Sequence, residues 1–232
     1  LKRLMAILLC LCMALTLLPT AALAAAVGET IHVGGVKLTT TAETPTVYAR
    51  TVGGAVTTDG ADGNNYDIMW DGETLTLSGA DIQGAHGFSY NTASASAAIY
   101  RTGGLEIALL GENKVSNPGG ESGINHSFGI YAGGGLTISG SGSLAASGGE
   151  GSTGSYGIYT DWGRVTVSGG GKVTATGGEA KYYSYGIYAD GGITVQSGSI
   201  TAEGGAAENE SYGIYVTRET LAISGGTVHA TG

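Results

Sequence analysis

The pentapeptide SYGIY occurs three times in this chain, at Ser155–Tyr159, Ser184–Tyr188 and Ser211–Tyr215, with a near copy at Ser127–Tyr131. The glycines of the four copies stand 28, 29 and 27 residues apart. A more divergent copy, Ala98-Ile99-Tyr100, in which alanine replaces the glycine, precedes them. Repetition at a fixed period of this length indicates a solenoid, in which each unit forms one coil and buries its apolar face against its neighbours.

Each repeat unit also contains two short runs rich in aliphatic and β-branched residues, separated by glycine. The runs are Leu136-Thr137-Ile138, Val165-Thr166-Val167, Ile193-Thr194-Val195 and Leu221-Ala222-Ile223, each followed by Leu144-Ala145-Ala146, Val173-Thr174-Ala175, Ile200-Thr201-Ala202 and Val228-His229-Ala230 respectively. Three strands in about 28 residues fit one coil of a parallel β-helix, whereas a propeller blade needs about 40 residues and four strands. We therefore predict an all-β fold, a right-handed single-stranded parallel β-helix of about six three-strand coils. An antiparallel sandwich or a propeller is the alternative.

The predicted domain limits follow from where the repeats begin and end. The β-helix covers residues 66–232, and its first coil holds Ile68-Met69-Trp70, Leu75-Thr76-Leu77 and Asp81-Ile82. Residues 25–65 are expected to form the N-terminal cap of the solenoid. The last coil reads Ala230-Thr231-Gly232, whereas earlier third strands close on a glycine pair. We therefore expect the natural chain to continue, and the given chain to self-associate through its uncapped C-terminal coil.

Strand alternation assigns the faces of the repeated segment. If Ile158 points inward, Tyr156 does too, while Gly157 and Tyr159 point outward. The interior is thus expected to hold an aromatic column of Phe128, Tyr156, Tyr185 and Tyr212, whose hydroxyls need hydrogen-bond partners. The outer surface is expected to carry the column of Tyr100, Tyr131, Tyr159, Tyr188 and Tyr215.

An outward column of phenol rings, with glycine beside it, predicts a carbohydrate-binding surface formed by Tyr100, Tyr131, Tyr159, Tyr188 and Tyr215. Sugar rings stack their C–H faces on aromatic rings, and their hydroxyls find partners in phenol groups. Ladder packing alone also explains the repetition, because identical stacked side chains stabilise a solenoid. In that alternative the chain is a structural stalk or spacer of a larger surface protein.

Several segments carry a family resemblance. The stretches YDIMWDGETLTLSGADI (66–82) and GLEIALLGEN (104–113), with the repeated SYGIY and VTATGG, resemble the glycine-rich parallel β-helix proteins of gut Clostridia that are often labelled carbohydrate-binding-domain-containing proteins. The resemblance covers nearly the whole chain after its first segment. It implies a secreted or surface-attached, non-catalytic, adhesin-like protein whose partner is a polysaccharide or other glycan.

The first 24 residues are typical of a bacterial secretory signal peptide. Lys2 and Arg3 precede an apolar run from Leu4 to Leu18, and Ala22-Leu23-Ala24 offers small residues for cleavage after about Ala24. The run is shorter than the roughly 20 residues of a spanning helix, so we expect no transmembrane segment in the mature chain. Cys10 and Cys12 both lie in this segment, which leaves a cysteine-free secreted or cell-surface protein.

The charge of the chain excludes some partners. Removing Lys2 and Arg3 takes the formal net charge from −9 to about −11. Nucleic acid and anionic membranes both require a basic footprint, so neither is expected to bind.

Residues suited to catalysis are sparse on the predicted outer face. Its outward positions are mostly threonine, alanine and glycine, interrupted by Glu106 and His229 on different strands several coils apart. Polysaccharide lyases and hydrolases need acidic residues and a base gathered at one place. We therefore expect no enzymatic activity and no cofactor, and rank a lyase or hydrolase third among the functions.

Two groups of polar residues bear on metal binding. Asp59, Asp62 and Asp67, with two asparagines between them, form an oxygen-rich segment that calcium can use, although a plain polar turn is the alternative. His86 and His126, with Glu121, fall in long loops without fixed geometry. We predict no metal site there.

Overall fold

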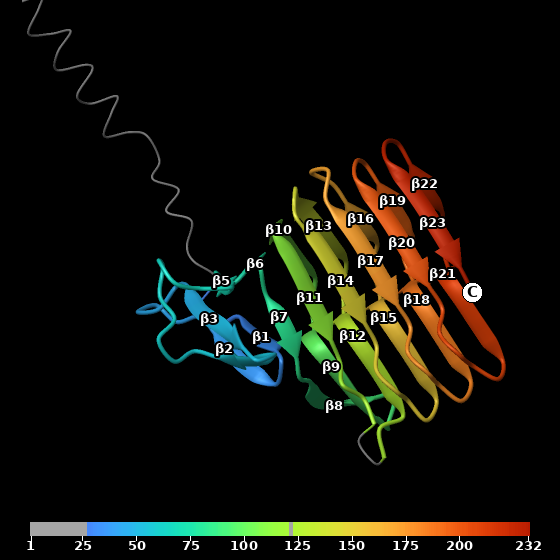
Figure 1. The fold of residues 1–232 in the computed structure, drawn as a ribbon, viewed down its shortest axis with the longest axis horizontal. Coiled ribbons are helices and arrows are strands. Elements are labelled where there is room, and N and C mark those ends of the chain that lie inside the picture. The colour runs from blue at the N-terminus through green and yellow to red at the C-terminus, as the bar shows by residue number, and fades with distance from the viewer. Residues whose placement is uncertain (1–26, 121–122) are drawn as a thin grey trace, which may run out of the picture.

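The computed structural model describes residues 27–120 and 123–232, and the regular structure in these ranges is all β. The predicted signal peptide, with Cys10 and Cys12, and also Glu121 lie outside the described residues. Stacked parallel strands form a β-solenoid of about five turns, rather than the six that were expected. Figure 1 shows the coils following one another from green to red, with the N-terminal strands at one end and the C-terminus at the other.

The SYGIY repeats form the first strand of each coil and lie side by side in one sheet, called here the aromatic sheet. Its parallel strands are β9 (Ala93–Arg101), β12 (His126–Ala132), β15 (Gly154–Thr160), β18 (Tyr183–Ala189) and β21 (Glu210–Val216). At its N-terminal edge, β9 pairs antiparallel with β8 (His86–Tyr90) and with β1. Each SYGIY copy therefore lies directly beside its equivalents.

The second and third runs of each repeat form two further parallel sheets. The second runs are β6 (Thr74–Ser78), β10 (Leu105–Leu110), β13 (Leu136–Gly140), β16 (Val165–Val167), β19 (Ile193–Val195) and β22 (Leu221–Ile223). The third runs are β7 (Asp81–Gln83), β11 (Glu112–Ser116), β14 (Ser143–Ser147), β17 (Lys172–Thr176), β20 (Ser199–Glu203) and β23 (Thr227–Thr231), called here the six-stranded sheet. The predicted three strands per coil are confirmed.

The N-terminal strands are antiparallel and close the first end of the solenoid. They are β1 (Thr30–Val33), β2 (Val36–Thr39), β3 (Val47–Val52), β4 (Ala55–Thr57) and β5 (Ile68–Trp70). The expectation that Ile68–Trp70 opens the first coil is wrong, because β5 pairs antiparallel with both β3 and β6. The indole of Trp70 is buried, donates to the carbonyl of Glu29 at 3.2 Å and lies under the Arg101 guanidinium.

The core is a set of aliphatic ladders that run along the solenoid. The register stacks Ile130 on Ile158, Ile158 on Ile187 and Ile187 on Ile214. The first three are fully buried, and Ile214 packs against the same core cluster, so the predicted isoleucine ladder is confirmed. In the last coil the equivalent apolar positions Leu221 and Ile223 are exposed.

Candidate functional site

An irregularity at the repeated glycine sets the faces of the aromatic sheet. The ladder between β12 and β15 pairs the residues on either side of the glycine and passes over the glycine itself. A Cβ on Gly157 would lie 2.6 Å from the backbone nitrogen of Thr176 in the six-stranded sheet, so Gly157 faces the interior. Ile158 faces the interior as well, and alternation is broken as in a β-bulge. Tyr156 and Tyr159 consequently share the outer face, with ring centroids 5.2 Å apart.

The predicted inward aromatic column is therefore wrong. Phe128, Tyr156 and Tyr185 belong to a separate aromatic cluster together with Tyr131 and Tyr159, not to the aliphatic core. The alternation rule failed because the glycine is one extra inward residue. The residues that precede it in the strand therefore point to the face opposite to the one that strict alternation predicts.

Serine occupies the inner position that tyrosine was expected to fill. The hydroxyl of Ser155 donates to the carbonyl of Gly149 at 2.7 Å and accepts from the amide of Gly178 at 2.8 Å. Ser184 repeats the pattern one coil later, donating to Gly178 at 2.7 Å. Each buried serine thus joins the loop that closes the preceding coil to the loop that closes its own coil.

The outer face carries two parallel columns of stacked rings, called here the aromatic face. In the tyrosine column successive ring centroids lie 5.4, 5.5, 4.7 and 5.5 Å apart, in the order Tyr100, Tyr131, Tyr159, Tyr188 and Tyr215. In the second column they lie 4.8, 5.6 and 5.8 Å apart, in the order Phe128, Tyr156, Tyr185 and Tyr212. The predicted tyrosine column thus exists, but it is half of a wider surface.

Access to the aromatic face differs along its length. Tyr131 and Tyr159 are only 8% and 4% exposed, whereas Tyr215 is 37% and Tyr212 44% exposed. The expectation of an open row of rings is wrong at the centre, where neighbouring rings and the side chains of strand β8 cover the face. The more open part of the face lies toward β21, the edge strand of the aromatic sheet.

Strand β8 covers the centre with two aromatic side chains. The ring of Phe88 lies 4.3 Å from that of Tyr100 and 5.1 Å from that of Tyr131. Tyr90 reaches Tyr159, with ring centroids 5.7 Å apart and a hydrogen bond of 2.6 Å between the hydroxyls. These contacts shield the rings in the N-terminal half of the aromatic face from solvent.

An exposed tryptophan borders the open half, and the sequence analysis did not identify it. Trp162 is 68% exposed and lies in the turn after β15, with the guanidinium of Arg218 4.7 Å from its ring centroid. The Nε of Arg218 pairs with Asp190 at 3.1 Å. Trp162 and Arg218 follow Tyr159 and Tyr215 by three residues, and Gly191 holds the same position between them. Aligning the repeats by position gives this signal.

Asp190 links this corner to the tyrosine column. Burial raises the pKa of Tyr188, and the charges of nearby groups that include Asp190 raise it further. Asp190 is itself buried and accepts from the hydroxyl of Thr217. The open half of the face therefore combines planar aromatic surface with a fixed carboxylate and a guanidinium.

The three candidate calcium ligands, Asp59, Asp62 and Asp67, are held by separate local contacts. Asp67 accepts from the backbone and hydroxyl of Thr51 at 2.7 and 2.9 Å, and Asp62 accepts from the backbone of Asn64 at 2.8 Å. The backbone of Asp59 is held by Thr57. No group of three or more metal-ligating side chains occurs in residues 27–120 and 123–232.

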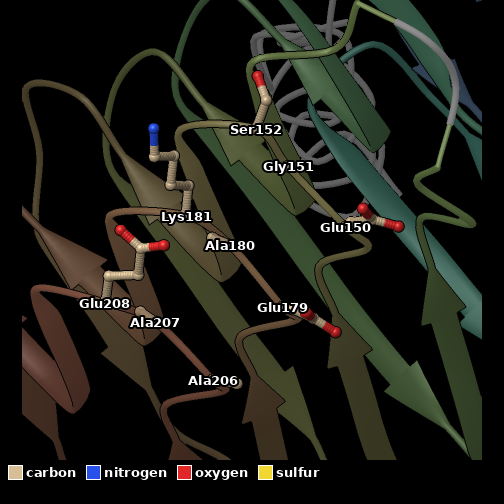
Figure 2. A pocket seen from close by; sticks show the side chains of 9 residues that line it. All are labelled: Glu150, Gly151, Ser152, Glu179, Ala180, Lys181, Ala206, Ala207 and Glu208. Carbon is tan, nitrogen blue, oxygen red and sulfur yellow. The ribbon is translucent and has the colours of Figure 1, made fainter.

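Two open grooves also contain charged side chains. One, of about 400 Å³, is lined by Glu73, Glu106 and Arg101, but Arg101 is held by Glu29 at 3.0 Å. The other, of about 390 Å³, lies along the loops that follow the third strands. Figure 2 shows its acidic side chains diverging instead of converging on one point, with Glu150 and Glu179 directed away from Lys181. Neither groove brings its charged side chains together at one point, as a catalytic or ion-binding site would require.

Two general findings bear on function. Within the described ranges, no helix has the length and apolarity to cross a membrane. Comparison with known proteins gave no match to a family model, to a curated protein or to a solved structure.

Proposed function

We propose that this protein is a secreted or cell-surface, non-catalytic β-solenoid that binds glycans on the open half of its aromatic face. The observation that carries the proposal is the group of rings at the C-terminal coils formed by Tyr188, Tyr212 and Tyr215, with the exposed Trp162 in the turn after β15. Flat, rigid aromatic surface suits the C–H faces of sugar rings and loses little conformational entropy on binding.

Polar groups at the rim supply the hydrogen bonds that hydroxyl-rich ligands need. The phenol hydroxyls and the Asp190 carboxylate border the rings, and the Arg218 guanidinium lies over the Trp162 ring while its Nε pairs with Asp190. Because Asp190 and Arg218 neutralise each other, we expect a neutral glycan to bind better than a strongly charged one. The resemblance to β-helix proteins labelled as carbohydrate-binding supports the same proposal.

A structural stalk is the second candidate, favoured by the closed centre of the face. Phe128, Tyr156 and Tyr159 are buried among one another, as expected if the ring columns mainly stabilise the stack. In this alternative the open rings are only the exposed continuation of the same ladder.

A glycan array followed by affinity electrophoresis separates the two functions. We expect the protein to be retained by a neutral polysaccharide, and Trp162→Ala or the pair Tyr188→Ala with Tyr215→Ala to lose at least tenfold in affinity, since hot-spot aromatics dominate such interfaces. Tyr66→Ala, in the segment between β4 and β5, is the control. Absence of binding to every glycan, with β-sheet circular dichroism intact, would reject the proposal in favour of the stalk.

A further inference from the structure

Strand β8 pairs with β9 at the N-terminal edge of the aromatic sheet, and its Phe88 and Tyr90 rings cover the centre of the aromatic face. Histidines contact β8 from both of its neighbouring segments. His86 belongs to β8, His32 stacks on His86, and His126 packs against Tyr90. We propose that β8 is a proton-sensitive strap, which covers the aromatic face when these histidines are neutral and opens when they become charged. Its effect on glycan binding rests on the proposed function, whereas the opening itself does not.

The His32–His86 pair is the first element of the switch. The two imidazole rings are nearly parallel, with centroids 3.7 Å apart and an interplanar angle of 11°. Lys37 stands directly opposite His32 in the ladder between β1 and β2. Protonation of both imidazoles would therefore place three positive charges together at the junction of β8 with the cap, and like charges at such distances repel.

His126 is the second element. Its ring lies 5.1 Å from that of Tyr90 in an edge-on contact, and its Nδ1 is buried without a hydrogen-bond partner. The rings of Phe128 and Tyr156 border its other sides at 6.3 and 6.2 Å. A protonated His126 would bury an additional unpaired N–H group against aromatic rings, which is costly.

The groups around the three histidines offer few negative charges that could stabilise protonated imidazoles. Tyr100 lies 5.9 Å from His32 and 5.3 Å from His86, ring to ring. On this side of the sheet Asp161 accepts from the hydroxyls of Tyr131 and Tyr159, and Glu210 accepts from the hydroxyl of Tyr185. In residues 27–120 and 123–232 none of the histidines forms an ion pair.

The direction of the pH effect follows from burial. Burial lowers the pKa of His32, His86 and His126 below the ordinary value near 6.5, and the charges of His86 and Lys37 lower that of His32 further. The closed strap thus binds fewer protons than the open one. Its stability is complete above about pH 6.5 and falls as the pH drops below that value.

The turn that joins β8 to β9 is strained in a way that favours opening. Asn91 and Thr92 have φ angles of +47° and +69°. Asparagine tolerates this region, but threonine is β-branched and rarely adopts it. Thr92→Gly should therefore hold the strap closed more firmly.

Hydrogen–deuterium exchange followed by mass spectrometry tests the strap without any ligand. Rates are compared at pH 7.5 and pH 5.0 after normalisation to the intrinsic chemical rates. We expect protection of residues 86–92 to fall several-fold at pH 5.0, because the open strap binds more protons than the closed one. Protection of β18 should stay unchanged, and Thr92→Gly should raise protection of β8 at both pH values.

The histidine variants complete the test. His32→Gln combined with His86→Gln should reduce the pH dependence, and adding His126→Gln should abolish it, while His229→Gln at an exposed position should leave it intact. Equal protection of wild-type β8 at both pH values, or a pH effect that survives in the triple variant, would overturn the proposal. Because the assay contains no glycan, failure of the strap leaves glycan binding standing. Binding that is lost while the strap still opens would reject the proposed function alone.

Discussion

The hydroxyl oxygens of Tyr90 and Tyr159 lie 2.6 Å apart, although 69 positions separate the two residues in the chain. Tyr90 comes from a strand outside the repeat, and Tyr159 from the middle of the tyrosine column. The carboxylate of Asp161 accepts from Tyr159 at 3.3 Å and from Tyr131 at 3.4 Å. One short chain of hydrogen bonds therefore holds the cover, the column and the following turn together.

This arrangement predicts that the fold depends on neutral tyrosines. Burial raises the pKa of Tyr131, Tyr156, Tyr159 and Tyr185 well above the ordinary value of about 10, and nearby carboxylates and phenols add to the effect. A group whose pKa is raised by folding contributes stability that is complete below its unfolded pKa. The free energy of unfolding should therefore decline as the pH rises above about 10.

Absorbance of tyrosinate and circular dichroism, recorded along one alkaline titration, check this expectation. The buried tyrosines should ionise only together with the loss of the β-sheet signal. Reversible ionisation of all tyrosines in a chain that keeps its β-sheet signal would contradict it.

The repeated glycine makes a second prediction. A Cβ on Gly157 would meet backbone atoms on two sides, at 2.6 Å from Thr176 and 2.7 Å from Gly186, and backbone cannot move aside as a side chain can. We expect Gly157→Ala to destabilise the fold by about 3 kcal/mol, at the upper end of overpacking costs. Gly103→Ala is the matched control, because a Cβ there meets nothing within 4 Å. It should change stability by less than about 0.5 kcal/mol in urea denaturation. Equal effects of the two changes would mean that the glycine is not a packing requirement.

Much of the fold could be predicted from the sequence because a solenoid repeats its own local rules. The spacing of the glycines gave the coil length, and the short aliphatic runs gave the second and third strands, as with Val165-Thr166-Val167 in β16. Once the strands are parallel and in register, equivalent residues such as Ile158 and Ile187 must be neighbours.

The faces of the aromatic sheet could not be predicted by alternation. Gly157 adds an inward residue, which places Tyr156 on the same side as Tyr159. Glycine and tyrosine both occur on either face of a strand, so their hydropathy does not show which way they point. The better signal was Ser155, a small hydroxyl residue repeated at every coil, since a repeated serine next to glycine loops can satisfy buried backbone groups.

Strand β8 was missed for another reason. His86–Tyr90 has no equivalent in the later coils, so periodicity says nothing about it, and its turn, Asn91-Thr92, lacks the glycine that marks a tight hairpin. The exposure of the candidate site could not be predicted for the same reason. Whether rings such as Tyr131 are open or covered depends on a segment that lies outside the repeat.

The buried serines make the last prediction. Ser184 donates to the carbonyl of Gly178 at 2.7 Å and accepts from the amide of Gly205 at 2.8 Å, and its side chain is fully buried. Ser184→Ala keeps the size of the side chain nearly unchanged but leaves the Gly205 amide without this partner. Removing one member of a buried hydrogen bond costs about 1–3 kcal/mol. Ser199→Ala, at a half-exposed position of β20, is the control and should cost less than about 0.5 kcal/mol. Because each serine joins adjacent coils, the double variant Ser155→Ala with Ser184→Ala should also increase hydrogen exchange in the loops that contain Gly178 and Gly205. Loss of stability without faster exchange in those loops would show that the serines do not join the coils.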